Sequence, residues 1–159
     1  MKAKSIKGKS TEEIQTALAD SMQDGFNPTL AIVFTSIKQN WKEIVSLLDK
    51  QSIQIFGSTT SGEFIDGEIG EGSIAVMLLD INPSFFKILF EETGDQTSLE
   101  NAKKVGTAGK NIFSNPAFII ASGWLQIDGE QIVEGIEAGF GGEPTIFGGM
   151  AGDDLALTA

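Results

Sequence analysis

Hydrophobic positions along this chain recur with two spacings, one typical of helices and the other typical of buried strands. Apolar residues repeat every three to four positions in four segments, which predict helices over about 10–24, 41–50, 97–112 and 128–140. Uninterrupted apolar runs, which are typical of strands buried on both faces, occupy 30–35 and 117–121, with shorter runs at 53–56 and 145–147. Each half of the chain therefore reads helix, strand, helix, strand, and the short connections predict parallel strand pairs.

Polar residues at the expected helix starts support these boundaries. Ser10 with Glu13, and Thr97 with Glu100, have the spacing of a capping box, in which each side chain satisfies an amide of the first turn. Asn27-Pro28 prevents the first helix from continuing.

Further strands are expected in addition to the two helix–strand–helix–strand halves. Residues 73–79 and 85–91 predict an antiparallel pair joined by a turn at 80–84. The basic segment 1–9 reads either as a frayed arm or as a first edge strand. The predicted fold class is α/β with a mixed sheet (α+β), with an antiparallel pair of strands between two similar halves.

The two halves share a motif that points to an internal duplication. Ile55-Phe56-Gly57 returns as Ile146-Phe147-Gly148, and the Gly62-Glu63 that follows aligns with Gly152-Asp153 without a gap. The strands upstream of each motif also align, with 30–36 matching 117–123. Internal repeats of this kind define the architecture of a chain.

The second half lacks the antiparallel pair that follows the motif in the first half. We therefore expect residues 1–159 to form a single domain whose second half is incomplete. Either the chain is truncated, or another chain completes its strands.

Composition narrows the classes of partner. A net charge of −11 repels the phosphates of nucleic acids and the surface of anionic membranes, so neither is an expected partner. No apolar run approaches the ~18 residues of a membrane span. Cysteine is absent, which is compatible with the cytoplasm.

The residues after the motif strands are the candidate ligand-binding site. Ligands of open α/β sheets bind beyond the carboxyl ends of the strands, where the motif loops should gather. Hydroxyls and loop amides suit a carboxylate, and acidic side chains suit an ammonium group, so an amino acid matches the mixture. The alternative is that these side chains only satisfy local turns and caps. The candidate residues are Ser58, Thr59, Thr60, Ser61, Gly62, Glu63, Ser122, Trp124, Gly148, Gly149, Gly152 and Asp153.

The same residues give little support to catalysis or to a cofactor. Histidine is absent, which excludes a Ser-His-Asp triad, and no lysine lies within either loop. The Gly57–Gly62 spacing lacks the Lys-Ser/Thr pair of a phosphate-binding loop. An all-oxygen metal site from Glu63, Asp66, Asp153 and Asp154 is a less favoured alternative. No catalytic residue, metal or cofactor is predicted.

Four segments together resemble a known family. Leu-Ala-Ile-Val-Phe-Thr-Ser, Ile-Phe-Gly-Ser-Thr-Thr-Ser-Gly-Glu-Phe, Gly-Ser-Ile-Ala-Val-Met-Leu-Leu and Ile-Phe-Gly-Gly-Met-Ala-Gly-Asp-Asp, in this order, resemble the FIST N-terminal domain (F-box and intracellular signal transduction proteins) over about residues 28–155.

The resemblance implies a sensory input domain that binds small ligands, amino acids among them, and that is followed by a FIST C-terminal domain. In bacteria such domains occur alone or joined to kinase, chemoreceptor or cyclic-dinucleotide modules. It also implies further chain after Gly-Asp-Asp. Some relatives are associated with haem sensing, but this chain has no histidine and departs from any histidine-ligated scheme.

Three functions follow as hypotheses. The first is a ligand-binding sensory domain without chemistry of its own. The second is a hydrolase-like enzyme that uses loop hydroxyls and carboxylates. The third is a scaffold that holds a partner domain.

Overall fold

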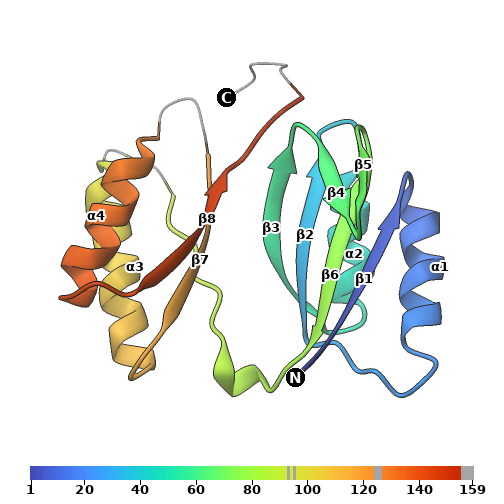
Figure 1. Ribbon diagram of the computed structural model, residues 1–159, viewed down its shortest axis with the longest axis horizontal. Coiled ribbons are helices and arrows are strands. Elements are labelled where there is room, and N and C mark those ends of the chain that lie inside the picture. The colour runs from blue at the N-terminus through green and yellow to red at the C-terminus, as the bar shows by residue number, and fades with distance from the viewer. Residues whose placement is uncertain (93, 95, 124–126, 155–159) are drawn as a thin grey trace. The chain divides into compact units, whose positions relative to one another are not determined.

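The structure, a computed structural model, describes residues 1–92, 94, 96–123 and 127–154, and these form two compact units (Figure 1). Unit 1 comprises Met1–Lys87 together with the described residues 151–154. Unit 2 comprises Ile88–Met150. Each unit has a separate hydrophobic core.

Unit 1 is built on a four-stranded mixed sheet in the order β1-β6-β2-β3 (Figure 1). Its strands are β1 (Lys2–Gly8), β2 (Leu30–Ser36), β3 (Gln54–Thr60) and β6 (Ile74–Asp80). β2 and β3 are parallel, whereas β6 runs antiparallel to both β1 and β2. The basic N-terminal segment is therefore an edge strand and not a frayed arm.

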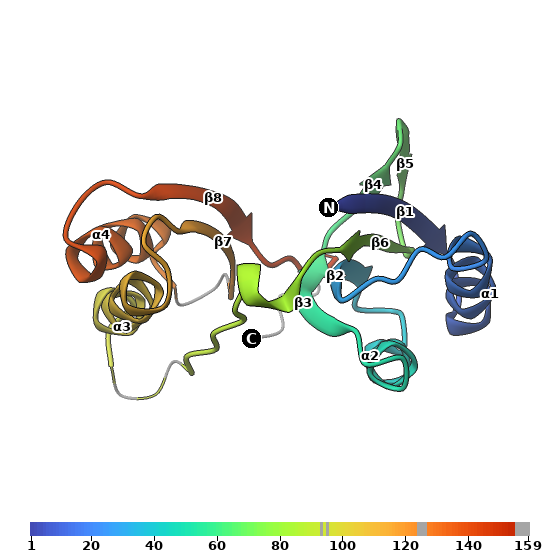
Figure 2. The same cartoon turned by 90° about the horizontal axis from the view of Figure 1, so that it is seen from below.

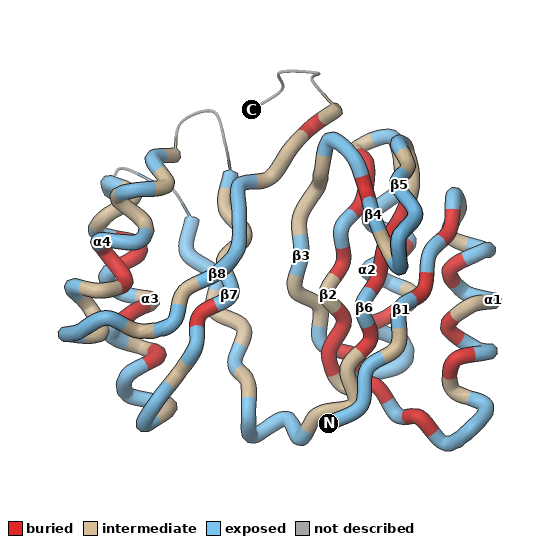
Figure 3. The backbone as a smooth tube through the Cα atoms, viewed as in Figure 1, coloured by how far each residue is buried: buried red, intermediate tan, exposed pale blue. Residues whose placement is uncertain are grey.

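The helices of unit 1 cover one face of this sheet. Figure 2 shows α1 (Thr11–Ser21) and α2 (Trp41–Asp49) on the same side of the strands. Alternate residues of the strands face the helices, and Figure 3 shows the resulting buried positions. The core contains Ile14 and Leu18 of α1, Ile44 and Leu48 of α2, and Ala31, Val33, Ile74, Val76 and Leu78 of the sheet.

Short elements link β3 to β6 and leave the sheet after β6. β4 (Glu63–Ile65) and β5 (Glu68–Gly70) form an antiparallel hairpin. After β6 the chain makes a single 3-10 turn, η1 (Pro83–Phe85).

The predicted pairing of 73–79 with 85–91 is wrong. Residues 74–80 do form a strand, β6, but its two edges are occupied by β1 and β2 along nearly its whole length. No edge remains for 85–91, which adopts no strand. The alternation of Phe85 to Phe90 resembled a strand, but both of these phenylalanines are exposed.

The apolar stripe that predicts α2 is only partly buried. Ile44 and Leu48 are buried, as expected, but Trp41 is 49% exposed and Val45 is 40% exposed. These two side chains lie at the margin of the helix–sheet interface, where they line a pocket described below.

Unit 2 packs two helices against two parallel strands. α3 (Ser98–Ile112) and α4 (Gly129–Phe140) accompany β7 (Ala117–Ser122) and β8 (Thr145–Met150). Thr97 and Glu100 form the predicted capping box, and the hydrogen bonds from Thr97 lower the pKa of Glu100. A side chain at Gly106 or Gly139 would overlap the backbone of the facing helix, so the glycines of α3 and α4 permit close packing.

The two parallel pairs have the same register relative to the repeated motif. Gly57 of β3 lies opposite Val33 of β2, and Gly148 of β8 lies opposite Ile120 of β7. In both pairs a Cβ on the glycine would overlap the carbonyl oxygen of the residue opposite. Each copy of Ile-Phe-Gly therefore places its glycine where one strand of a parallel pair closely approaches the other.

The position of β6 inside the sheet gives a prediction of stability. Leu78→Ala removes a fully buried side chain from the core and should lower the free energy of unfolding by about 2–5 kcal/mol. The neighbouring Met77 points to the opposite face and is 45% exposed, so Met77→Ala should cost below about 1 kcal/mol. Urea denaturation followed by circular dichroism measures both, and equal costs would contradict the assignment of faces.

Candidate functional site

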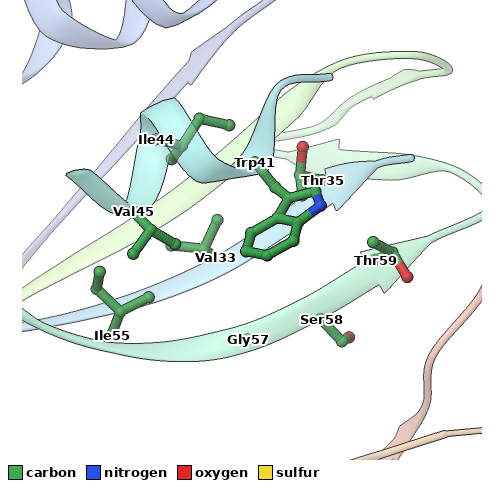
Figure 4. Close-up of a pocket in the computed structure, with 9 residues that line it drawn as sticks. All are labelled: Val33, Thr35, Trp41, Ile44, Val45, Ile55, Gly57, Ser58 and Thr59. Carbon is green, nitrogen blue, oxygen red and sulfur yellow. The ribbon is translucent and has the colours of Figure 1, made fainter. Parts of the chain in front are cut away.

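An open pocket of about 270 Å³ lies between α2 and the sheet of unit 1, and the sequence did not predict it. Figure 4 shows its walls, which come from β2, α2 and β3. They are Val33, Thr35, Trp41, Ile44, Val45, Ile55, Gly57, Ser58 and Thr59.

The alternation of strand residues explains why the pocket lies here. Ile55, Gly57 and Thr59 point to the same face of β3, the face that α2 covers. The middle residue has no side chain, and any Cβ there would overlap the carbonyl oxygen of Val33. A gap therefore remains between Ile55 and Thr59, and the indole of Trp41 lies over it (Figure 4).

The pocket is apolar at one end and carries hydroxyls at the other. Val33, Val45 and Ile55 lie on one side of the indole, and Thr35 and Thr59 lie on the other, toward the ends of β2 and β3 (Figure 4). None of the nine lining residues is ionisable. This end of parallel strands is the position at which α/β sheets bind ligands.

Residues 57–63, called here the first motif loop, were expected to follow the strand, but β3 continues to Thr60 and β4 begins at Glu63. Their side chains lie in two environments. Ser58 and Thr59 line the pocket, whereas Glu63 lies on β4 and is only 4% exposed. Thr60 Oγ1 donates to the Glu63 carboxylate at 2.8 Å, and Ser73 donates both its amide, at 2.9 Å, and its hydroxyl, at 2.8 Å. This carboxylate thus fixes the turn after β3 to the start of β6, which is the local role that the sequence left open.

Glu63 also lines a second pocket of about 340 Å³, between β1, the β4–β5 hairpin and β6. Charged side chains surround it, including Lys7, Lys9 and Glu68. Lys7 forms an ion pair with Glu68 across it. The two pockets therefore differ in chemistry, and the acid of the first loop belongs to the charged one.

The residues that follow the second motif strand lie directly against the first motif loop within unit 1. The Gly152 amide donates to the Thr59 carbonyl oxygen at 2.9 Å. A Cβ on Gly152 would come within 2.5 Å of Ser61 Oγ, so the two segments are in close contact. The predicted proximity of Gly152 to the first loop is thus present as a packed contact.

Asp154 fixes this segment to the end of β2. Its carboxylate accepts a hydrogen bond from the hydroxyl of the fully buried Ser36 at 2.5 Å, a length typical of O–H···O⁻ bonds. Lys38 Nζ lies 3.5 Å from the same carboxylate oxygen. Asp154 has a φ of 53°, and the adjacent Asp153 is buried.

The other predicted site residues lie elsewhere. Ser122 ends β7 in unit 2, where it is half-buried, and Gly148 and Gly149 are exposed positions in β8. Gly62 and Ser61 are exposed in the turn between β3 and β4. Trp124 lies outside the described residues.

Sequence reasoning missed the apolar half of the pocket. Val33 and Ile55 belong to apolar strand runs, and Trp41 and Val45 belong to the apolar stripe of a helix, so the pattern predicts all four in the core. The available signal was Gly57 itself, because a glycine between two apolar or β-branched residues on one face of a strand leaves a hole there.

Among the described residues, no three carboxylates gather closely enough to hold a metal ion. None of the described helices has the length and apolar character required to span a bilayer.

Together, the mixed sheet and the pocket at the carboxyl ends of β2 and β3 define an α/β domain with a site of small-ligand size. Residues 29–159 match the FIST N domain, and the chain belongs to this family of sensory domains of signal transduction. Neither a curated protein nor a solved structure matches the chain.

Removal of the Asp154 side chain tests whether it holds residues 151–154 against β2 and β3. Asp154→Gly retains a residue suited to positive φ but leaves the buried Ser36 hydroxyl without its acceptor, a loss of about 1–3 kcal/mol. Hydrogen exchange of the Gly152 amide should accelerate by about fivefold or more.

Asp66→Gly is the matched control, because Asp66 also has a positive φ, of 50°, and is exposed in the β4–β5 turn. It should leave the exchange of the Gly152 amide unchanged. An unchanged rate in Asp154→Gly would contradict the role assigned to this carboxylate.

Proposed function

We propose that this domain senses a small metabolite, and that an amino acid or a close relative of one is its ligand. Membership of a sensory family supports the general role. The single observation that carries the proposal is the pocket between α2 and β3, which opens onto Ser58 and Thr59 of the first motif loop.

The polar end of this pocket suits the head group of an amino acid. Thr35 and Thr59 offer hydroxyls that can donate to a carboxylate, whereas the Ser58 side chain points to the other face of β3 (Figure 4). The Asp154 carboxylate lies beyond the same end of β2, where Ser36 and Lys38 already contact it, and in our proposal the ammonium group of the ligand joins these contacts. An amino acid carries both charges and needs both kinds of partner.

In our proposal the signal passes through residues 151–154, which pack against the end of β3. Thr59 lines the pocket with its side chain and accepts the Gly152 amide with its carbonyl oxygen. A ligand that shifts the end of β3 therefore also shifts the chain that follows β8. We propose a FIST C-terminal domain or a signalling module as the partner that receives this movement, and the cytoplasm of a bacterium as the location.

Catalysis is not part of this proposal. The Glu63 carboxylate that accepts the Thr60 hydroxyl also accepts the amide and the hydroxyl of Ser73, and we assign these contacts to the turn. The Ser36 hydroxyl, which donates to Asp154, is fully buried and out of reach of a substrate. A serine-reactive probe that labelled Ser58 or Ser61 would favour the hydrolase alternative. A scaffold would bind its partner domain but no metabolite.

A ligand screen with a matched pair of variants tests the proposal. We expect at least one of the twenty common L-amino acids, or a related metabolite, to raise the melting temperature of the full-length protein and to bind in calorimetry. The double variant Thr35→Val/Thr59→Val should weaken that binding by about tenfold or more, because two hydroxyls at the polar end are lost.

The control is Thr16→Val, which removes an exposed hydroxyl from α1, away from the pocket. It should bind as the parent does. Absence of binding by every metabolite tested, or undiminished binding by the double variant, would refute the site.

A further inference from the structure

The apolar end of the pocket has a composition of its own that limits which ligands can occupy it. Val33, Ile44, Val45 and Ile55 form its walls, and the indole of Trp41 forms one side (Figure 4). These residues come from three different elements, β2, α2 and β3. The compartment is therefore built by the tertiary fold and not by one local turn.

Two of these side chains are exposed although apolar. Trp41 and Val45 lie one turn apart on α2 and retain about half and two-fifths of their accessible surface. Exposed apolar area next to a concavity loses its contact with water when an apolar group enters, which stabilises the complex. An indole face also offers a flat surface for an aromatic ring or a branched alkyl group.

The absence of charged groups from the pocket lining also limits which ligands can bind. The nine lining residues include no carboxylate, ammonium or guanidinium group that could pair with a charged side chain of a ligand. Transfer of an unpaired charge into such surroundings is costly. The part of the ligand that enters the apolar end must therefore be neutral.

Size sets the upper limit. A volume of about 270 Å³ lies just below the usual range of ligand pockets, which is about 300–1,000 Å³. It admits one ring or branched alkyl group with a small polar head. It does not admit a macrocycle or a dinucleotide.

We infer that this site selects ligands with a compact hydrophobic group, of which phenylalanine and leucine are the amino-acid representatives, and that Trp41 and Val45 determine this specificity. The inference rests on the proposed sensory function and names the ligand class of the same site. The hydrophobic group lies against Trp41, and the polar head lies toward Thr35 and Thr59.

Calorimetry of the full-length protein with four probes tests the inference. L-phenylalanine and L-leucine should bind, whereas L-glutamate and L-lysine should bind at least about tenfold more weakly. Trp41→Ala should weaken the binding of L-phenylalanine by about tenfold or more. Val45→Lys places a charge in the apolar end and should do the same, so it serves as the second variant if Trp41→Ala does not fold.

Phe64→Ala is the matched control, because Phe64 is an exposed aromatic residue of unit 1 on β4, outside the pocket. It should bind L-phenylalanine as the parent does. Binding of L-phenylalanine unaltered by either pocket variant would overturn the inference.

The failure of the inference and the failure of the proposed function give different results. Binding of L-glutamate or L-lysine in preference to both hydrophobic amino acids would overturn the inference and leave the sensory role intact. Binding of no amino acid or related metabolite at all would refute both.

Discussion

The close approach of Gly57 to the backbone of β2 is the constraint on which the site depends. The carbonyl oxygen of Val33 occupies the space that a Cβ at residue 57 would need, so only glycine allows β2 and β3 to pair in this register. That register aligns Thr35 with Thr59 at the ends of the two strands. Because residue 57 is glycine, it has no side chain to fill the space beneath Trp41.

The same contact links the pocket to the rest of unit 1. Because β3 is fixed against β2, its last residues present a backbone carbonyl to Gly152 and side chains to the pocket. Ser36, at the end of β2, likewise contacts this segment, because its hydroxyl donates to the Asp154 carboxylate. Two neighbouring strand ends therefore hold the segment that follows β8, and a ligand between α2 and β3 would be next to both attachments.

Much of this arrangement could be predicted from the sequence, because periodicity and capping are local signals. The N-caps of α1 and α3, the strand over 30–35 and the two parallel strand pairs follow from spacing alone. The pairing of β6 with β1 could not be predicted, because strand pairing depends on which edges are already occupied. The N-terminal strand also had no distinctive pattern. The exposed position of Trp41 could not be predicted either, since the inward stripe of a helix does not show where the facing sheet leaves a gap.

The role of Glu63 illustrates the limit for the site. An acid after a glycine-rich turn is equally suited to a ligand and to a local turn, and the sequence cannot tell where the hydroxyl of Ser73 will lie. The fold places that hydroxyl and its amide on the carboxylate of Glu63 and so assigns the acid to the turn. The pocket, in contrast, takes its walls from residues that sequence reasoning had assigned to the core.

Binding of a small metabolite between α2 and β3, at the carboxyl ends of the parallel strands, can be followed by NMR. Amide chemical shifts would be recorded during a titration with L-phenylalanine. Saturable changes should concentrate at residues 33–36, 41–45 and 55–59, with a smaller change at Gly152. Saturable changes confined to the β4–β5 hairpin or to unit 2, with none along α2 and β3, would contradict binding at this site.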